Sequence, residues 1–132
     1  MILADTSAWV EYDRATGSPV DLRLADLIGS GDDLAVTEPV LMEVLAGARD
    51  EEAASELRRL LTSFGWVTAD AGVDFEGAAR VFRVCRTAGL TPGGLIDCMI
   101  ASIALRTGSA VLASDHGFAL MASVLPLRID QA

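Results

Sequence analysis

Residues 1–12 read Met1-Ile2-Leu3-Ala4-Asp5-Thr6-Ser7-Ala8-Trp9-Val10-Glu11-Tyr12, an apolar run followed by one acid, two hydroxyl residues and a mixed segment. The apolar run at residues 1–4 predicts a brief buried strand. Either Thr6 or Ser7 is a suitable N-cap for a helix that continues through Trp9, Val10 and Tyr12. A strand that passes directly into a helix is the first half of a βαβ unit.

The same alternation continues along the rest of the chain. Pro19 opens a second helix, which Gly29-Ser30-Gly31 ends. Strands separated by helices predict an α/β fold with a central parallel β-sheet flanked by helices on both faces. The further elements that we expect are a strand at residues 34–36, a helix capped by Thr37, a charged helix at 50–61, a strand at 66–68, a helix at 74–87, a helix that follows Gly93-Gly94 and runs to Arg106, and strands at 110–113 and 127–129.

The composition indicates one folded domain over residues 1–132. Hydrophobic residues make up 52% of the chain and charged residues 22%, which excludes a disordered chain. The longest apolar stretch, residues 95–105, contains Asp97 and is too short to span a membrane. The first basic residue is Arg14, which does not fit the start of a secretory signal. We therefore expect a cytoplasmic protein.

The charged side chains, the histidine and the cysteines exclude several classes of protein function. A net charge of −9 argues against a protein that coats nucleic acid, although a few arginines can still contact it locally. All ten basic residues are Arg, which excludes a Schiff-base or P-loop lysine. His116 is the only histidine, so a zinc site is not expected, and turn chemistry explains it better than a role as general base. Cys85 and Cys98 form no CxxC motif and are read as reduced core thiols.

Two acids follow predicted strands directly. Asp5 follows the first strand, and Asp115 follows the strand at residues 110–113. In an open parallel sheet, ligand sites lie beyond the carboxyl ends of the strands. Taken alone, each acid is also typical of a turn or a helix cap. Both are candidate site residues.

Asp97 gives a sharper signal. Its helix is apolar almost all round, which predicts burial. An acid in the first turn is favoured by the helix dipole, but desolvating an isolated carboxylate costs several kcal/mol. No Lys exists in the chain and no Arg lies nearby in sequence. A bound cation is the expected partner.

Glu43 borders the apolar face of the helix that contains Val40 and Val44. Alone it would be read as a solvated glutamate. Four carboxylates in one cleft would repel one another, and a divalent cation would relieve this. Ligation by oxygen alone selects magnesium or manganese over zinc. The residues therefore predict metal-dependent phosphodiester hydrolysis, in which the ion activates water and stabilises an in-line phosphoryl transition state.

With these motifs the chain resembles a PIN domain, specifically a VapC-type ribonuclease toxin of a bacterial toxin–antitoxin pair. The resemblance covers essentially all 132 residues. Each motif alone is weak, but four in the same order and spacing are specific. They are Ile2-Leu3-Ala4-Asp5-Thr6-Ser7-Ala8-Trp9, Glu38-Pro39-Val40-Leu41-Met42-Glu43-Val44, Leu95-Ile96-Asp97-Cys98-Met99-Ile100-Ala101 and Val111-Leu112-Ala113-Ser114-Asp115-His116-Gly117-Phe118.

The resemblance implies an endoribonuclease whose Mg²⁺ (or Mn²⁺) site is formed by the acids that match Asp5, Glu43, Asp97 and Asp115. It places a hydroxyl, here Thr6, near that site, and Ser114 is expected to act in the same way. It also implies an RNA substrate, a homodimer, and a small DNA-binding antitoxin of the VapB type. The C-terminal segment of that antitoxin would fill the cleft, often with an arginine among the acids.

One position departs from the family pattern. The last motif commonly reads Asp-x-Asp-Phe, and Gly117 replaces its second acid here. Asp115 is then the only candidate for the fourth acid, and a second metal would be held more weakly. The alternative that stays open is a catalytically weak or inactive PIN fold that serves as a binding module. A phosphoacceptor domain would need a lysine, and a haloacid-type phosphatase would need Asp-x-Asp after the first strand.

Three arginines on one predicted helix are candidates for RNA contacts. Arg80, Arg83 and Arg86 lie along the helix at residues 74–87 and could meet phosphates. The alternative is an ordinary solvated face.

Overall fold

The strands form one parallel sheet in the computed structural model, which describes residues 1–31 and 33–132. Within that part of the chain the sheet has five strands in the order β3-β2-β1-β4-β5. All four neighbouring pairs are parallel, as the βαβ pattern predicts. The strands are β1 (Ile2–Ala4), β2 (Leu34–Val36), β3 (Gly65–Trp66), β4 (Ala110–Leu112) and β5 (Arg128–Ile129).

Both faces of the sheet centre are covered. Every residue of β2 and β4 is buried, and so are Leu3 and Ala4 in β1. Consecutive strand residues point to opposite faces, so an unbroken buried run requires packing on both sides. The predicted α/β architecture is confirmed.

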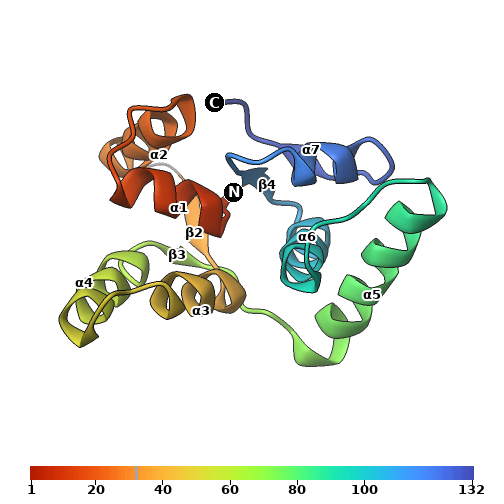
Figure 1. Cartoon of the computed structure of the whole chain (residues 1–132), viewed down its shortest axis with the longest axis horizontal. Helices are drawn as coiled ribbons and strands as arrows, with labels where there is room; N and C mark the ends of the chain where they lie inside the picture. The colour runs from red at the N-terminus through yellow and green to blue at the C-terminus, as the bar shows by residue number, and fades with distance from the viewer. Residues whose placement is uncertain (32) are drawn as a thin grey trace.

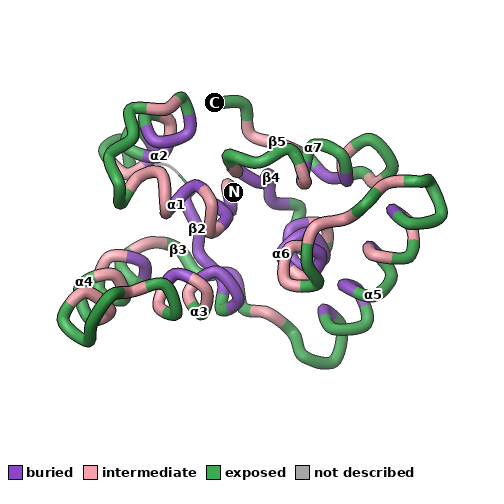
Figure 2. The backbone as a smooth tube through the Cα atoms, viewed as in Figure 1, coloured by how far each residue is buried: buried purple, intermediate pink, exposed green. Residues whose placement is uncertain are grey.

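Helices make the crossovers between these strands (Figure 1). The most buried of them is α6, which has six buried residues and lies beside α5 (Figures 1 and 2). A Cβ on Gly77 of α5 would clash with Ser102 of α6, so this glycine permits their close approach. The helices are α1 (Thr6–Asp13), α2 (Pro19–Ser30), α3 (Glu38–Ala46), α4 (Glu51–Leu61), α5 (Ala71–Thr87), α6 (Leu95–Thr107) and α7 (Gly117–Ala122).

Several boundaries differ from the sequence predictions, each for a local reason. The N-cap of α1 is Asp5 rather than Thr6 or Ser7, because its carboxylate accepts from the Ser7 backbone N–H. Helix α5 begins earlier than predicted, since Asp70 caps it by accepting from Gly72 N–H. The third strand is Gly65–Trp66 rather than residues 66–68. Helix α7, a six-residue helix, was not predicted.

Other features agree with expectation. Pro19 lies at the start of α2 and Gly31 ends it in the left-handed conformation, as the proline and glycine signals predict. Cys85 and Cys98 are buried free thiols. In the part of the chain that is described, no helix combines the length and apolarity needed to cross a membrane.

Candidate metal centre

The strand order brings the first acid to the middle of the sheet edge. β1 lies between β2 and β4, and Asp5 follows its last residue. The Asp5 N–H donates to the carbonyl oxygen of Leu112 at 2.8 Å, which ties the end of β1 to β4. The carboxyl ends of parallel strands share one edge, so the site lies where open α/β sheets bind ligands.

Asp5 is buried, and only one of its two carboxylate oxygens accepts hydrogen bonds. Its side chain Oδ2 accepts from Ser7 N–H at 3.1 Å and from Ser7 Oγ at 2.8 Å. Among the described residues, its Oδ1 is one of the buried side-chain atoms that lack a hydrogen-bond partner. A buried oxygen without a donor is costly, and a cation bound there would remove that cost.

Glu43 reaches the site from α3. Thr6 Oγ1 donates to Glu43 Oε1 at 2.7 Å, which fixes one of its oxygens. The hydroxyl that was expected near the acids is therefore in contact with one of them.

Asp97 lies in the first turn of α6 and faces the other acids. A Cβ on Gly93 would clash with the Asp97 carboxylate, so the glycine before the helix leaves room for this side chain. In the sequence Gly93 indicates only the start of a helix, because its proximity to Asp97 depends on the three-dimensional turn.

Three of the four predicted acids form one group. One carboxylate oxygen each from Asp5, Glu43 and Asp97 lies within 4.8 Å of the others. Carboxylates alone supply the donors, which is the chemistry that hard divalent cations prefer. With the unpartnered oxygen of Asp5, this donor set fits a divalent cation.

The fourth acid, Asp115, lies outside this group. Its Oδ1 accepts from Gly117 N–H at 3.0 Å, and the residue is exposed. It is still close enough to affect the others, since its charge raises the pKa of both Asp5 and Asp97.

The pKa values of two acids of the group are raised, because burial and neighbouring negative charges disfavour their ionised forms. Burial and then repulsion by Asp5, Asp115 and Glu43 raise the pKa of Asp97 to about 6. Burial is also the main cause that raises the pKa of Asp5, against the hydrogen bonds from Ser7 that lower it. Such shifts are typical of acids that share a site.

Ser7 is a site residue that sequence analysis recognised only as a possible helix cap. Its hydroxyl donates to Asp5 and accepts from the backbone N–H of Ser114 at 3.0 Å. Ser114 thus holds Ser7 through its backbone, whereas its own hydroxyl was the expected contact. The position two residues after an N-cap aspartate is the signal that indicates this bond.

The glycine of the last motif is not required by its backbone conformation. Gly117 starts α7 and does not have a positive φ. A Cβ there would lie 3.2 Å from Asp115 Oδ1. A side chain at this position would therefore crowd Asp115. His116 is exposed and precedes α7, in agreement with the turn interpretation.

The three arginines of α5 are exposed. Arg86 stacks over the Phe82 ring at 5.7 Å. Within residues 1–31 and 33–132, none of Arg80, Arg83 and Arg86 forms an ion pair with an acid. They stay candidates for phosphate contacts.

The sequence is similar to proteins of known family. The family model for the PIN domain matches residues 2–124. Ribonuclease VapC11 of Mycobacterium tuberculosis is 39% identical over 129 residues, covering 97% of this chain and 96% of the relative. Ribonuclease VapC32 of the same species is 32% identical over 117 residues, covering 87% of this chain and 85% of the relative.

Solved structures share the fold. A chain of VapBC2 from Rickettsia felis, bound to a DNA fragment from the promoter, matches with a TM-score of 0.76 at 18% identity and covers 98% of both chains. Mycobacterium tuberculosis VapC20, a Sarcin-Ricin loop cleaving toxin, matches with a TM-score of 0.71 at 19% identity and covers 97% of this chain and 99% of that one. With the family match and the 39% identity to VapC11, these findings show that the chain belongs to the PIN-domain family and, within it, to the VapC proteins.

Proposed function

We propose that this chain is a divalent-metal-dependent endoribonuclease that acts as the toxin of a toxin–antitoxin pair. The observation that carries the proposal is the convergence of Asp5, Glu43 and Asp97 within 4.8 Å at the edge of the sheet. The VapC relatives bear the name ribonuclease, which gives RNA as the substrate class. We place this activity in the cytoplasm, where RNA substrates are found.

Mg²⁺ is the proposed ion, and Mn²⁺ is expected to replace it because both accept all-oxygen ligands. When bound, such an ion acts as a Lewis acid that lowers the pKa of water and stabilises negative charge on a phosphate. Asp5, Glu43 and Asp97 would hold it. Asp115 is the fourth acid of the proposed catalytic group and adds negative charge from outside the three.

The surrounding hydroxyls orient these ligands. Ser7 fixes Oδ2 of Asp5 and leaves Oδ1 free for the ion, while Thr6 fixes one oxygen of Glu43. Ser114 supports Ser7 through its backbone N–H. Hydrogen bonds to ligating carboxylates set their direction and tune the affinity of a metal site.

RNA is proposed to contact the outer face of α5. Arg80, Arg83 and Arg86 are exposed there and make no ion pair within the described ranges. A guanidinium without an acidic partner is available for a phosphate.

Two protein partners belong to the proposal. A VapB-type antitoxin with a basic C-terminal segment would complement the net charge of −9, and an arginine could sit among the acids. A second copy of the chain is the other partner. Met42 and Phe75 are 53% and 63% exposed and line a groove of about 560 Å³ between α3, α5 and α6. Sedimentation velocity on the isolated chain tests the dimer, and a monomer at micromolar concentration would count against it.

Cleavage of a labelled single-stranded RNA tests the enzymatic proposal. The wild-type protein should cut with Mg²⁺ or Mn²⁺ and stop with EDTA, whereas Asp97→Asn should stay inactive with its fold intact. RNA binding without cleavage in the wild-type protein would instead support a binding module that has lost its activity.

A further inference from the structure

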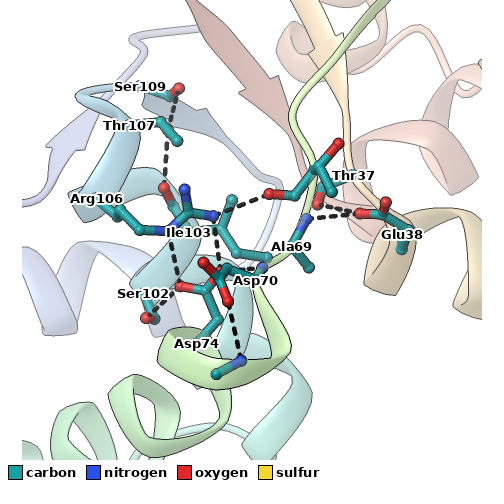
Figure 3. Close-up of polar contacts among 12 residues, drawn as sticks. Thr37, Glu38, Ala69, Asp70, Asp74, Ser102, Ile103, Arg106, Thr107 and Ser109 are labelled. Atoms are coloured by element: carbon teal, nitrogen blue, oxygen red, sulfur yellow. Dashed lines mark hydrogen bonds and ion pairs between the residues drawn. The ribbon is translucent and has the colours of Figure 1, made fainter.

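Residues 68–70, within the linker that connects β3 to α5, are held from two sides by side chains of α3 and α6 (Figure 3). From α3, Glu38 Oε1 accepts from Ala69 N–H at 2.7 Å. From α6, Arg106 Nη2 donates to the carbonyl oxygen of Thr68 at 2.9 Å. The same two helices carry Glu43 and Asp97.

The α3 side of this linker has several bonds to one carboxylate. Glu38 is the first residue of α3, and its Oε2 also accepts from the indole Nε1 of Trp66 at 3.1 Å. Partial burial opposes ionisation of this group, but the hydrogen bonds from Ala69 and Trp66 outweigh it and lower the pKa of Glu38. The linker therefore has a charged anchor on α3.

The α6 side is buried more deeply. Arg106 forms an ion pair with Asp74, with Nη2 2.7 Å from Oδ2, and Asp74 is fully buried. Asp74 Oδ2 accepts from Asp70 N–H at 2.8 Å, and its Oδ1 accepts from Ser102 Oγ at 2.9 Å (Figure 3). These bonds fasten the linker and the start of α5 to α6.

The linker also lines the groove between α3, α5 and α6. That groove is lined by Glu38 and Met42 of α3, by Ala69 of the linker and by Met99 of α6. Near the metal centre the two helices present Glu43 and Asp97, whose like charges favour separation. The two helices also contact each other directly, and the linker adds a second connection away from the carboxylates.

We propose that Glu38 and Arg106 are positioning residues, which hold α3 and α6 at the spacing that lets Glu43 and Asp97 share one cation. This inference rests on the proposed metal centre. Neither residue belongs to the carboxylate group itself, so each acts through the linker.

Glu38→Ala tests the α3 side with little risk to folding, because Glu38 is exposed. Glu51→Ala is the matched control, since Glu51 is also an exposed acid at the first position of its helix. Calorimetric titration with Mn²⁺ measures affinity, and amide hydrogen exchange at Ala69 reports whether the linker bond is lost. We expect Glu38→Ala to bind Mn²⁺ about tenfold more weakly, a loss of the size that is common when groups that support a metal site are removed. The control Glu51→Ala should bind Mn²⁺ as tightly as the wild-type protein.

Two more measurements separate positioning from general destabilisation. Cleavage by Glu38→Ala should recover at saturating Mn²⁺ with an unchanged kcat, and Glu38→Gln, which can still accept from Ala69, should keep an affinity closer to wild type. Arg106→Lys tests the α6 side while it keeps the charge beside Asp74, and it should also weaken Mn²⁺ binding.

Faster exchange at Ala69 with unchanged Mn²⁺ affinity in Glu38→Ala would overturn the inference. Failure of the wild-type protein to bind Mn²⁺ would instead overturn the metal centre itself.

Discussion

Gly93 lies against the Asp97 carboxylate so closely that a Cβ at this glycine would overlap it. The neighbouring Gly94 has open space where its Cβ would be. We expect Gly93→Ala to displace Asp97 and to weaken Mn²⁺ binding about tenfold, since the position of a ligating carboxylate is set by what surrounds it. Gly94→Ala is the control at the adjacent position. Equal Mn²⁺ affinities for the two variants would show that Gly93 does not set the position of Asp97.

Removing the charge of Asp97 should stabilise the metal-free protein. Burial and three neighbouring acids disfavour its ionised form. Because the side chain is half-buried and solvent screens it, we expect Asp97→Asn to add about 1 kcal/mol, or ~4 °C in Tm. Added Mn²⁺ should then raise the Tm of the wild-type protein more than that of the variant. Equal shifts measured by scanning calorimetry would mean that the acids do not share one ion.

The pKa of Asp97 also predicts a pH dependence. The folded-state pKa of about 6 exceeds the ordinary value of 3.8, so the folded chain binds this proton more tightly than the unfolded chain. The stabilisation is fully present below pH 3.8 and is lost as pH rises through about 6. Denaturant titrations of metal-free protein from pH 4 to about pH 7 should show this decline in the wild type and a smaller one in Asp97→Asn. Parallel pH curves would contradict the assignment.

Variants of Asp115 and Gly117 test whether the fourth acid ligates the ion. Asp115 acts on Asp5 and Asp97 through its charge but lies outside their group. Asp115→Asn should therefore weaken Mn²⁺ binding less than Asp97→Asn does. Gly117→Asp would place a carboxylate close to Asp115, and its crowding of Oδ1 should limit any gain in affinity. Calorimetry on the three variants decides the matter, because equal losses in Asp115→Asn and Asp97→Asn would make Asp115 a direct ligand.

The arginines of α5 predict a salt effect. Replacing Arg80, Arg83 and Arg86 together by Ala should weaken RNA binding. It should also reduce the slope of the logarithm of the binding constant against the logarithm of the salt concentration by roughly 2, since each phosphate contact on single strands contributes about 0.7. Arg58 and Arg59, both exposed on α4, provide a control pair. An unchanged slope, measured by fluorescence anisotropy, would mean that the three arginines form an ordinary solvated face without RNA contacts.

The sequence predicts the order of elements and the three acids that meet, because these depend on local patterns. Apolar runs alternate with helical segments, and Asp5 follows a strand end directly. Asp97 stands out because it is an acid within an apolar helix. The meeting of the acids in one site was expected from the strand ends and from the family resemblance, and the bound cation from the repulsion between the acids.

The remaining features depend on three-dimensional contacts that no local pattern encodes. Gly93 matters because of where the first turn of α6 points, and Ser7 because the Ser114 backbone reaches it. Helix α7 is too short to show a clear period. Asp115 Oδ1 accepts a hydrogen bond from the Gly117 backbone N–H, which a motif comparison does not reveal.

The long separation in sequence between Asp5 and Asp97 also determines when the centre can form during translation. Asp5 is tied to Leu112, and its neighbour Asp97 is encoded far downstream of it. During translation, the N-terminal third of the nascent chain therefore carries Asp5 and no partner from α6. The centre can assemble only when most of the chain has left the ribosome, so a truncated product that ends before α6 would be harmless to the RNA around it.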